Sequence, residues 1–144
     1  MTAPNNKEEH PMIYETIYRK LDRLGAIAAI QSGKDYDKSR IGEPFMDLNM
    51  DVLDRRGDYI VIALSHYFEQ NGDLCADPDM EIRIYPERSM AEALTFQQAI
   101  PPIYQEVYPA PGKVAPQLKR ELNDFLNLWL GNCIKQGHRF TGTA

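Results

Sequence analysis

The sequence has few of the residues that metal and redox sites require. Its 144 residues include two cysteines and three histidines, with no CxxC pair and no Cys/His cluster. A structural zinc site takes four such ligands at close spacing, so we expect no metal and no cofactor. Cys133 lies in an apolar helical pattern and is expected to be a small buried residue. Cys75 lies in a polar stretch, and a disulfide between the two is not expected in a reducing compartment.

Long apolar runs and excess positive charge are also missing. The longest apolar run, residues 59–64, is far too short to span a bilayer, and the first ten residues have no apolar signal core. Sixteen Lys and Arg face 21 Asp and Glu, which gives a formal net charge of -5. Because affinity for nucleic acid rests mainly on clustered cations, we expect a cytoplasmic protein that binds neither nucleic acid nor membrane.

The length and composition predict one domain. With 43% hydrophobic and 26% charged residues, the chain is ordinary for a globular protein with a single core. We expect a mobile tail over residues 1–9, the domain over 10–138 and a second tail over 139–144. A first helix is predicted to begin near Pro11 and to end at Ser32, with an apolar residue at every third or fourth position. Gly25 interrupts this pattern and suggests a close contact there.

The middle of the chain predicts an antiparallel meander. Apolar and polar residues alternate, or apolar residues run together, over 46–52, 59–68, 80–85 and 91–98. The second strand is apolar on both faces and is expected to be central, whereas residues 34–44 are expected to be a loop. For 90–98 a helix competes with a strand, because MAEAL consists of good helix formers.

The end of the chain predicts a long amphipathic helix. Five prolines make residues 100–116 unsuitable for a regular helix or a central strand, and Tyr104 and Tyr108 are expected to anchor this link to the domain. From Pro116 an apolar stripe recurs at steps of three and four, with Trp129 near its centre. The expected fold is a two-layer α+β domain: an N-terminal helix, a four-stranded antiparallel meander, and a C-terminal helix packed on the sheet.

Two patterns in this region resemble a known family. These are PxMxxRxY at Pro78, Met80, Arg83 and Tyr85, and FLxxWLxxCxxxG over residues 125–137. Together they are similar to the YqiB-like family, a bacterial domain of unknown function, over roughly residues 46–138. The stretch HYFEQNGDL from His66 also resembles a group of small proteins found on mobile elements. The family implies a compact bacterial domain and supplies no activity or catalytic residue.

The strongest candidate for a binding surface is the polar stretch between the second and third strands. We expect an acidic loop there, too long for a tight hairpin, with side chains at Glu69, Asn71, Asp73, Asp77 and Asp79. Its spacing does not match a calcium loop, which needs a later bidentate carboxylate. The alternative is a solvated turn whose side chains bond their own backbone.

His66 and Arg83 are the remaining candidates. A histidine near carboxylates can be a general base, although a satisfied histidine at a strand end is the more common case. Arg83 could bind an anion beside an aromatic pocket, or pair across the sheet with Glu81 or Glu92 on the solvent face. Aromatic residues at this spacing more often belong to the core.

We therefore expect a non-catalytic protein-binding domain, an inhibitor or adaptor encoded on a mobile element, whose partner is another protein. The competing hypothesis is a small-molecule-binding protein or enzyme that uses His66, Glu69 and Arg83 beside an aromatic pocket.

Overall fold

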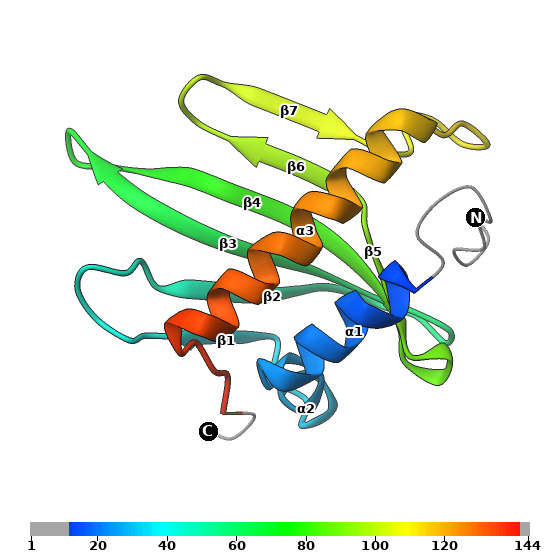
Figure 1. The fold of residues 1–144 in the computed structure, drawn as a ribbon, viewed down its shortest axis with the longest axis horizontal. Coiled ribbons are helices and arrows are strands. Elements are labelled where there is room, and N and C mark those ends of the chain that lie inside the picture. Colours follow the sequence, from blue (N-terminus) through cyan, green and yellow to red (C-terminus); the bar gives the residue numbers. More distant parts are fainter. Residues whose placement is uncertain (1–11, 142–144) are drawn as a thin grey trace.

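A computed structural model describes residues 12–141, which form an antiparallel sheet covered on one face by helices (Figure 1). The strand order is β1-β2-β3-β4-β6-β7, and β5 also pairs with β4. The strands are β1 (Tyr36–Ser39), β2 (Leu48–Arg55), β3 (Ile60–Gln70), β4 (Asp73–Tyr85), β5 (Met90–Ala93), β6 (Thr95–Gln98) and β7 (Ile103–Glu106). The helices are α1 (Ile13–Arg23), α2 (Ala26–Gln31), the 3-10 turn η1 (Pro86–Arg88) and α3 (Pro116–Gln136). The expected tail over 1–9 lies outside the described residues.

The core lies between the sheet and helices α1 and α3, which cross the same face of the sheet (Figure 1). Alternate side chains of β3 and β4 enter this core because successive strand residues point to opposite faces. From the helices, α1 contributes Ile17 and Leu21, and α3 contributes Leu126 and Leu130, all fully buried. The sheet contributes further buried apolar side chains, among them Ile62, Leu64, Met80, Ile82 and Ile84. The α+β class and the C-terminal helix on the sheet are thus confirmed.

The expected number of strands was wrong, since the sheet has seven and not four. β1 lies within residues 34–44, where a loop was expected, and β7 lies within the proline-rich link. Both are four-residue outer strands of the ordered path and carry too few residues to show a period. Residues 91–98 are extended as predicted, but they form β5 and β6 with a break at Leu94, which bonds both Glu81 and Val107 through its backbone.

The connection between β3 and β4 also differs from the expectation. The two strands are joined by a two-residue turn in which Asn71 and Gly72 have φ of 53° and 84°. Positive φ at both central positions defines the type I′ turn that Asn-Gly favours in hairpins. β4 therefore begins at Asp73, and the long polar loop predicted over 69–79 was wrong. Asp77 and Pro78 face the single residue His66, so the proline occupies a bulge where a strand tolerates it.

The predicted first helix is broken at Gly25, which separates α1 from α2. Gly25 has φ of 83°, and a side chain there would clash with the backbone carbonyl of Phe140. The amide of Phe140 donates a 2.6 Å hydrogen bond to the carbonyl of Leu24. The close contact expected at Gly25 is therefore present, and the end of the chain makes it. Phe140 is buried, although it lies in the segment 139–144 expected to be a tail.

Among residues 12–141, no helix combines the length and apolar character that crossing a bilayer requires.

Candidate functional site

The face of the sheet opposite the helices carries four carboxylates, which we call the acidic face: Asp51, Asp79, Glu81 and Glu106. Strand register places them together. Asp51 and Glu81 flank Ala63 of β3 on neighbouring strands. Asp79 is two residues from Glu81 on β4 and therefore points to the same side. On β7, Glu106 is opposite Thr95, whose hydroxyl accepts a hydrogen bond from the amide of Glu81 at 3.1 Å.

These carboxylates are partly shielded from water and close enough to repel one another. Burial raises the pKa of Asp51 above its ordinary value. Burial raises the pKa of Asp79 as well, with a further contribution from the charge of Asp51. The pKa of Glu81 is raised by burial and by the charges of Asp79 and Glu106. Within residues 12–141, none of the four carboxylates lies within 4.0 Å of a Lys, Arg or His nitrogen. The surface therefore carries concentrated, uncompensated negative charge.

Tyrosines accompany the acidic face. The hydroxyl of Tyr67 donates to Asp79 Oδ2 at 3.3 Å, and Tyr104 is paired with Gln97 across β6 and β7. Tyr36 and Tyr104 are 49% and 56% exposed. Tyr104 was expected to anchor the link against the domain, and its exposure shows that this was wrong. Large side chains with an apolar body and a polar tip are common in binding surfaces.

A second group of polar residues lies on the same face toward the far end of β4; we call it the Glu92 cluster: Arg83, Tyr85, Glu92 and Tyr108. Arg83 and Glu92 are directly paired across β4 and β5. Glu92 is 0% exposed, and it accepts hydrogen bonds from the hydroxyls of Tyr85 at 2.7 Å and Tyr108 at 2.6 Å. Arg83 Nη1 lies 3.9 Å from Glu92 Oε2. The pair expected on the solvent face is therefore an enclosed network.

The network positions Arg83 and Tyr108 with little freedom. The guanidinium lies 4.9 Å from the ring centroid of Tyr59 and 5.9 Å from that of Tyr108, within the range of cation–π contact. Burial raises the pKa of Glu92, and its two hydroxyl donors and Arg83 partly offset that effect. Burial, together with the nearby carboxylate, also raises the pKa of Tyr108. Burial also raises the pKa of Tyr85. Tyr85 and Tyr108 therefore stay protonated and act as donors at physiological pH.

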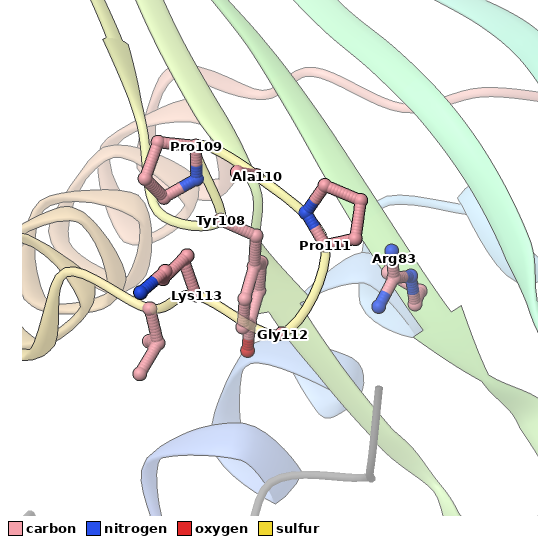
Figure 2. A pocket seen from close by; sticks show the side chains of 8 residues that line it. Arg83, Tyr108, Pro109, Ala110, Pro111, Gly112 and Lys113 are labelled. Atoms are coloured by element: carbon pink, nitrogen blue, oxygen red, sulfur yellow. The ribbon is translucent and has the colours of Figure 1, made fainter.

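A pocket of about 680 Å³ opens beside this cluster, between Arg83 of β4 and the loop that follows Tyr108 (Figure 2). We call it the Arg83 pocket. Its described lining residues are Arg83, Tyr108, Pro109, Ala110, Pro111, Gly112, Lys113 and Val114. Figure 2 shows the loop curving around the ring of Tyr108, with Arg83 on the neighbouring strand. A smaller cavity of about 160 Å³ separates the pocket from the acidic face and is lined by Glu81, Glu106, Arg83 and Tyr108, among others.

A third group, the His66 cluster, is buried on the helix side of the sheet: Ser39, His66, Cys133 and His138. His66 Nδ1 is 2.9 Å from the carbonyl oxygen of Asp47, so Nδ1 carries the proton and Nε2 is free to accept. Cys133 Sγ lies 3.8 Å from that Nε2. Ser39 Oγ is 2.9 Å from His138 Nδ1 and accepts the amide of Arg139 at 2.8 Å.

The thiol and imidazole in this cluster are not arranged as an activated nucleophile. Cys133 is 1% exposed, and burial raises its pKa to about 12, so the sulfur is a neutral thiol. A catalytic cysteine needs a lowered pKa and access to substrate. Burial also lowers the pKa of His66 and of His138, which keeps both rings neutral. Chemically, the cluster can hold α3 on the sheet but cannot attack a substrate.

The structure separates the residues that the sequence nominated. Glu69, Asn71 and Asp73 lie at the exposed end of the β3–β4 hairpin, and Asp77 is exposed at the bulge. Asp79 belongs to the acidic face. The other two are His66, buried on the helix side, and Arg83 on the opposite side. Along β3, His66 is five residues from Val61, the partner of Arg83, a separation of roughly 17 Å. His66, Glu69 and Arg83 therefore do not form one site.

Several important residues had no sequence signal strong enough to nominate them as a site. Glu92 was noted only as a surface partner for Arg83, and Tyr108 only as an anchor of the link. Cys133 was interpreted as a buried apolar residue, which its burial supports, but its contact with His66 joins positions 67 apart in the sequence. Among residues 12–141, no group of three or more His, Cys, Asp or Glu side chains is arranged to hold a metal ion.

Comparison with protein families gives one match. The model of the family described as Domain of unknown function (DUF6908) covers residues 15–139. The chain belongs to this family. The match includes α1 from Glu15 onward, the whole sheet and α3, and it does not show the YqiB-like resemblance. No curated protein and no solved structure matches the chain.

Proposed function

We propose that this member of the DUF6908 family is a non-catalytic protein-binding domain whose acidic face docks a basic surface of a partner protein. The observation that carries the proposal is that Asp51, Asp79, Glu81 and Glu106 lie together without a cation within 4.0 Å among the described residues. Their charges are costly in the free protein, as the raised pKa of three of them indicates.

A partner's Lys and Arg side chains would offset this cost. Opposite charges across an interface accelerate association and select the partner, and exposed tyrosines such as Tyr36 and Tyr104 supply contact area. The acidic docking surface would thus lie on the face of the sheet opposite the helices, and not in the loop expected over residues 69–79. Of the five loop residues considered, Asp79 alone lies within this surface.

The competing hypothesis, an enzyme or small-molecule site built from His66, Glu69 and Arg83, is not supported in that form because the three residues lie apart. The neutral, enclosed thiol of Cys133 beside His66 does not supply a nucleophile either. Arg83 does lie beside a pocket that Tyr108 lines, but neither His66 nor Glu69 is among its described lining residues.

The test compares two double variants with the same change in charge. Asp79→Asn with Glu81→Gln removes two charges from the acidic face, and Glu69→Gln with Asp73→Asn removes two from the hairpin tip. Wild type and both variants are used as baits in the native host. We expect wild type and the hairpin-tip variant to retain the same protein and the acidic-face variant to lose it.

The retained partner then allows a kinetic measurement. We expect the acidic-face variant to associate about tenfold more slowly at low salt, with the difference shrinking at higher salt because exposed charges are screened. Its melting temperature should stay equal or rise, since repulsion is removed. Equal losses in both variants would mean that net charge matters and that the acidic face is not the docking site. The identity of the partner also tests the expectation of an inhibitor or adaptor encoded on a mobile element.

A further inference from the structure

β7 is the last strand at one end of the strand order, and among residues 12–141 it pairs with β6 alone (Figure 1). Ile103 and Tyr104 of this strand are 37% and 56% exposed. β1, at the other end, is shielded, because Asp37 and Ser39 are buried and Ser39 Oγ accepts the amide of Arg139. Of the two ends of the strand order, β7 is therefore the open edge.

The hydrogen bonds around β6 show which backbone groups of β7 lie on this edge. The amide of Val107 donates to the carbonyl of Leu94, which directly precedes β6. Residues of an antiparallel strand face toward and away from the neighbouring strand in alternation. Gln105, two residues before Val107, therefore faces β6, whereas Tyr104 and Glu106 each direct an amide and a carbonyl away from it. Within residues 12–141, no strand pairs with β7 on that side.

β7 also lacks the common features that protect an exposed edge from pairing with another chain. Proteins protect such edges with lysine, proline or a bulge. The strand reads IYQE, without lysine or proline, and its register with β6 contains no bulge. Its four residues limit the pairing to a short stretch. The edge therefore suits one extended segment of a partner better than the edge of a second sheet.

The side chains along the edge favour a basic segment. Glu106 belongs to the acidic face and lies close enough to Glu81 to raise its pKa. Among the described residues, neither carboxylate has a cation within 4.0 Å. Ile103 lies on the opposite face, so the side chains of an added strand would lie beside Glu106 and Ile103 in alternation. A Lys or Arg suits the first position and an apolar residue the second.

The same charges disfavour a second copy of this chain as the occupant. Pairing two β7 strands would bring the Glu106 carboxylates of both copies onto one sheet, where like charges on neighbouring strands repel.

We propose that β7 accepts an extended segment of the partner as an added strand, and that basic and apolar residues alternate in this segment. The backbone hydrogen bonds would supply affinity, and the alternating side chains would supply specificity. This inference rests on the proposed docking at the acidic face and specifies which part of the partner reaches it.

The test uses two hexapeptides on the full chain at low salt, each made of three Lys and three Val with blocked ends. The residues alternate in the first peptide, and the three Val precede the three Lys in the second. The charge is equal, but only the alternating peptide can pair with β7 and direct every Lys to the acidic face. We expect calorimetry to show that it binds at least about fivefold more tightly.

N-methylation separates backbone pairing from charge. The methyl group removes an amide donor and blocks the approach of a neighbouring strand. One derivative of the alternating peptide is methylated at every Lys amide and the other at every Val amide, so each is the matched control of the other. Because only one of these sets can face β7, we expect one derivative to bind at least about tenfold more weakly and the other to bind as the parent peptide does.

A pair of protein variants tests the same edge from the other side. Tyr104→Pro removes an amide of the open edge, where a strand tolerates proline, and Tyr104→Val removes the same ring but keeps the amide. We expect Tyr104→Pro to bind the alternating peptide at least about fivefold more weakly than Tyr104→Val. If Tyr104→Pro does not fold, the methylated peptides decide the question with the wild-type protein.

Three results would overturn the added strand: no binding of the alternating peptide, equal binding of both unmethylated peptides, or equal binding of both methylated derivatives. A wild-type dimer in light scattering that Tyr104→Pro dissociates would also overturn it, since a second copy would then occupy the edge.

The acidic-face variant Asp79→Asn with Glu81→Gln separates this inference from the proposed function. If the variant weakens both unmethylated peptides alike, and wild type binds the two equally, docking at the acidic face stands and the added strand fails. If methylation shows pairing with β7 but the variant binds the alternating peptide as wild type does, the pairing stands and the acidic docking surface fails.

Discussion

The Glu92 cluster and the His66 cluster both contain polar side chains that are buried away from water, but these side chains are accommodated in different ways. In the Glu92 cluster a carboxylate is enclosed by two hydroxyl donors and a guanidinium. In the His66 cluster two imidazoles stay neutral, with ring centroids 5.6 Å apart. His138 Nε2 and Trp129 Nε1, beside it, have no hydrogen-bond partner among the described residues. The donors around Glu92 offset part of the effect of burial on its pKa, whereas burial keeps both imidazoles neutral.

The difference has a functional side. The Glu92 cluster fixes Arg83 and Tyr108, which line the Arg83 pocket, whereas the His66 cluster joins β1, β3 and α3 inside the core. Substitutions in the first should affect that pocket as well as stability. Substitutions in the second should affect stability and its dependence on pH.

The largest effect is expected from the aromatic wall of the His66 cluster. Trp129 is 7% exposed and lies edge-to-face with His66, with ring centroids 5.5 Å apart. We expect Trp129→Ala to lower the free energy of unfolding by about 3–5 kcal/mol, because truncating a buried aromatic leaves a cavity. Urea melts measure this. A loss below about 1 kcal/mol would show that α3 is held elsewhere and that Trp129 is free to act as an anchor for a partner.

Removing the central carboxylate of the other cluster should have a somewhat smaller effect. Glu92→Ala leaves the hydroxyls of Tyr85 and Tyr108 and the guanidinium of Arg83 without their shared acceptor. Removing the shared acceptor of buried donors typically costs about 2–4 kcal/mol. Urea melts give the cost. Unchanged stability would mean that the network is not structurally important.

The pH dependence of stability should follow the His66 cluster. Burial lowers the pKa of His66 and of His138 in the folded state. Below about pH 6.5 the unfolded chain binds protons that the folded protein excludes, so stability is present above that pH and is lost as pH falls. Each histidine contributes up to about 1.4 kcal/mol per pH unit.

His66→Gln provides the comparison for this prediction. The raised pKa of Glu92 and of Asp79 changes stability in the opposite direction, but equally in both proteins. We therefore expect the variant to keep the fold with a loss of about 1 kcal/mol at pH 7.5 and to have a shallower decline between pH 6.5 and 5.5. Parallel curves from urea melts at these pH values would show that His66 does not titrate on unfolding.

The smallest effect is expected outside both clusters. Asp73 is exposed at the start of β4, next to the Asn71-Gly72 turn. Asp73→Asn should change the free energy of unfolding by less than about 0.5 kcal/mol, as is usual for surface positions. A larger loss in thermal or urea melts would mean that this carboxylate stabilises the hairpin turn.

The sequence predicted correctly those helices and strands in which apolar residues recur many times at a regular spacing. The apolar stripe of α3 runs from Leu122 to Cys133, and the alternation in β4 places Met80, Ile82 and Ile84 in the core. β1 and β7 were not predicted because four residues are too few to show an alternating pattern. Each of them also forms only by pairing with a neighbouring strand, which the local sequence does not reveal. The tight hairpin was missed although Asn71-Gly72 is its usual signal, because Pro78 argued against a continuous strand and the bulge that accommodates it is a tertiary feature.

The candidate site was predictable only in part for a related reason. Arg83 was nominated from its type and position, but its environment is made by Glu92 on the next strand and Tyr108 beyond β7. The burial of Glu92 depends on these partners, since a glutamate in a strand of good helix formers gives no sign of it. The acidic face likewise joins Asp51 to Glu81 through Ala63 of the strand between them, which requires the register.

The contact between Gly25 and Phe140 affects when the protein can fold. The break between α1 and α2 is closed by the backbone of Phe140, and α1 packs against α3. During synthesis α1 ends at Arg23, 93 residues before α3 begins at Pro116 and 117 residues before Phe140. Its apolar side, including Ile17 and Leu21, packs on β5 as well, so its burial is complete only when nearly all of residues 12–141 have been made. Contacts between segments so distant in the sequence slow folding, and they prolong the time during which an aggregation-prone apolar surface is exposed.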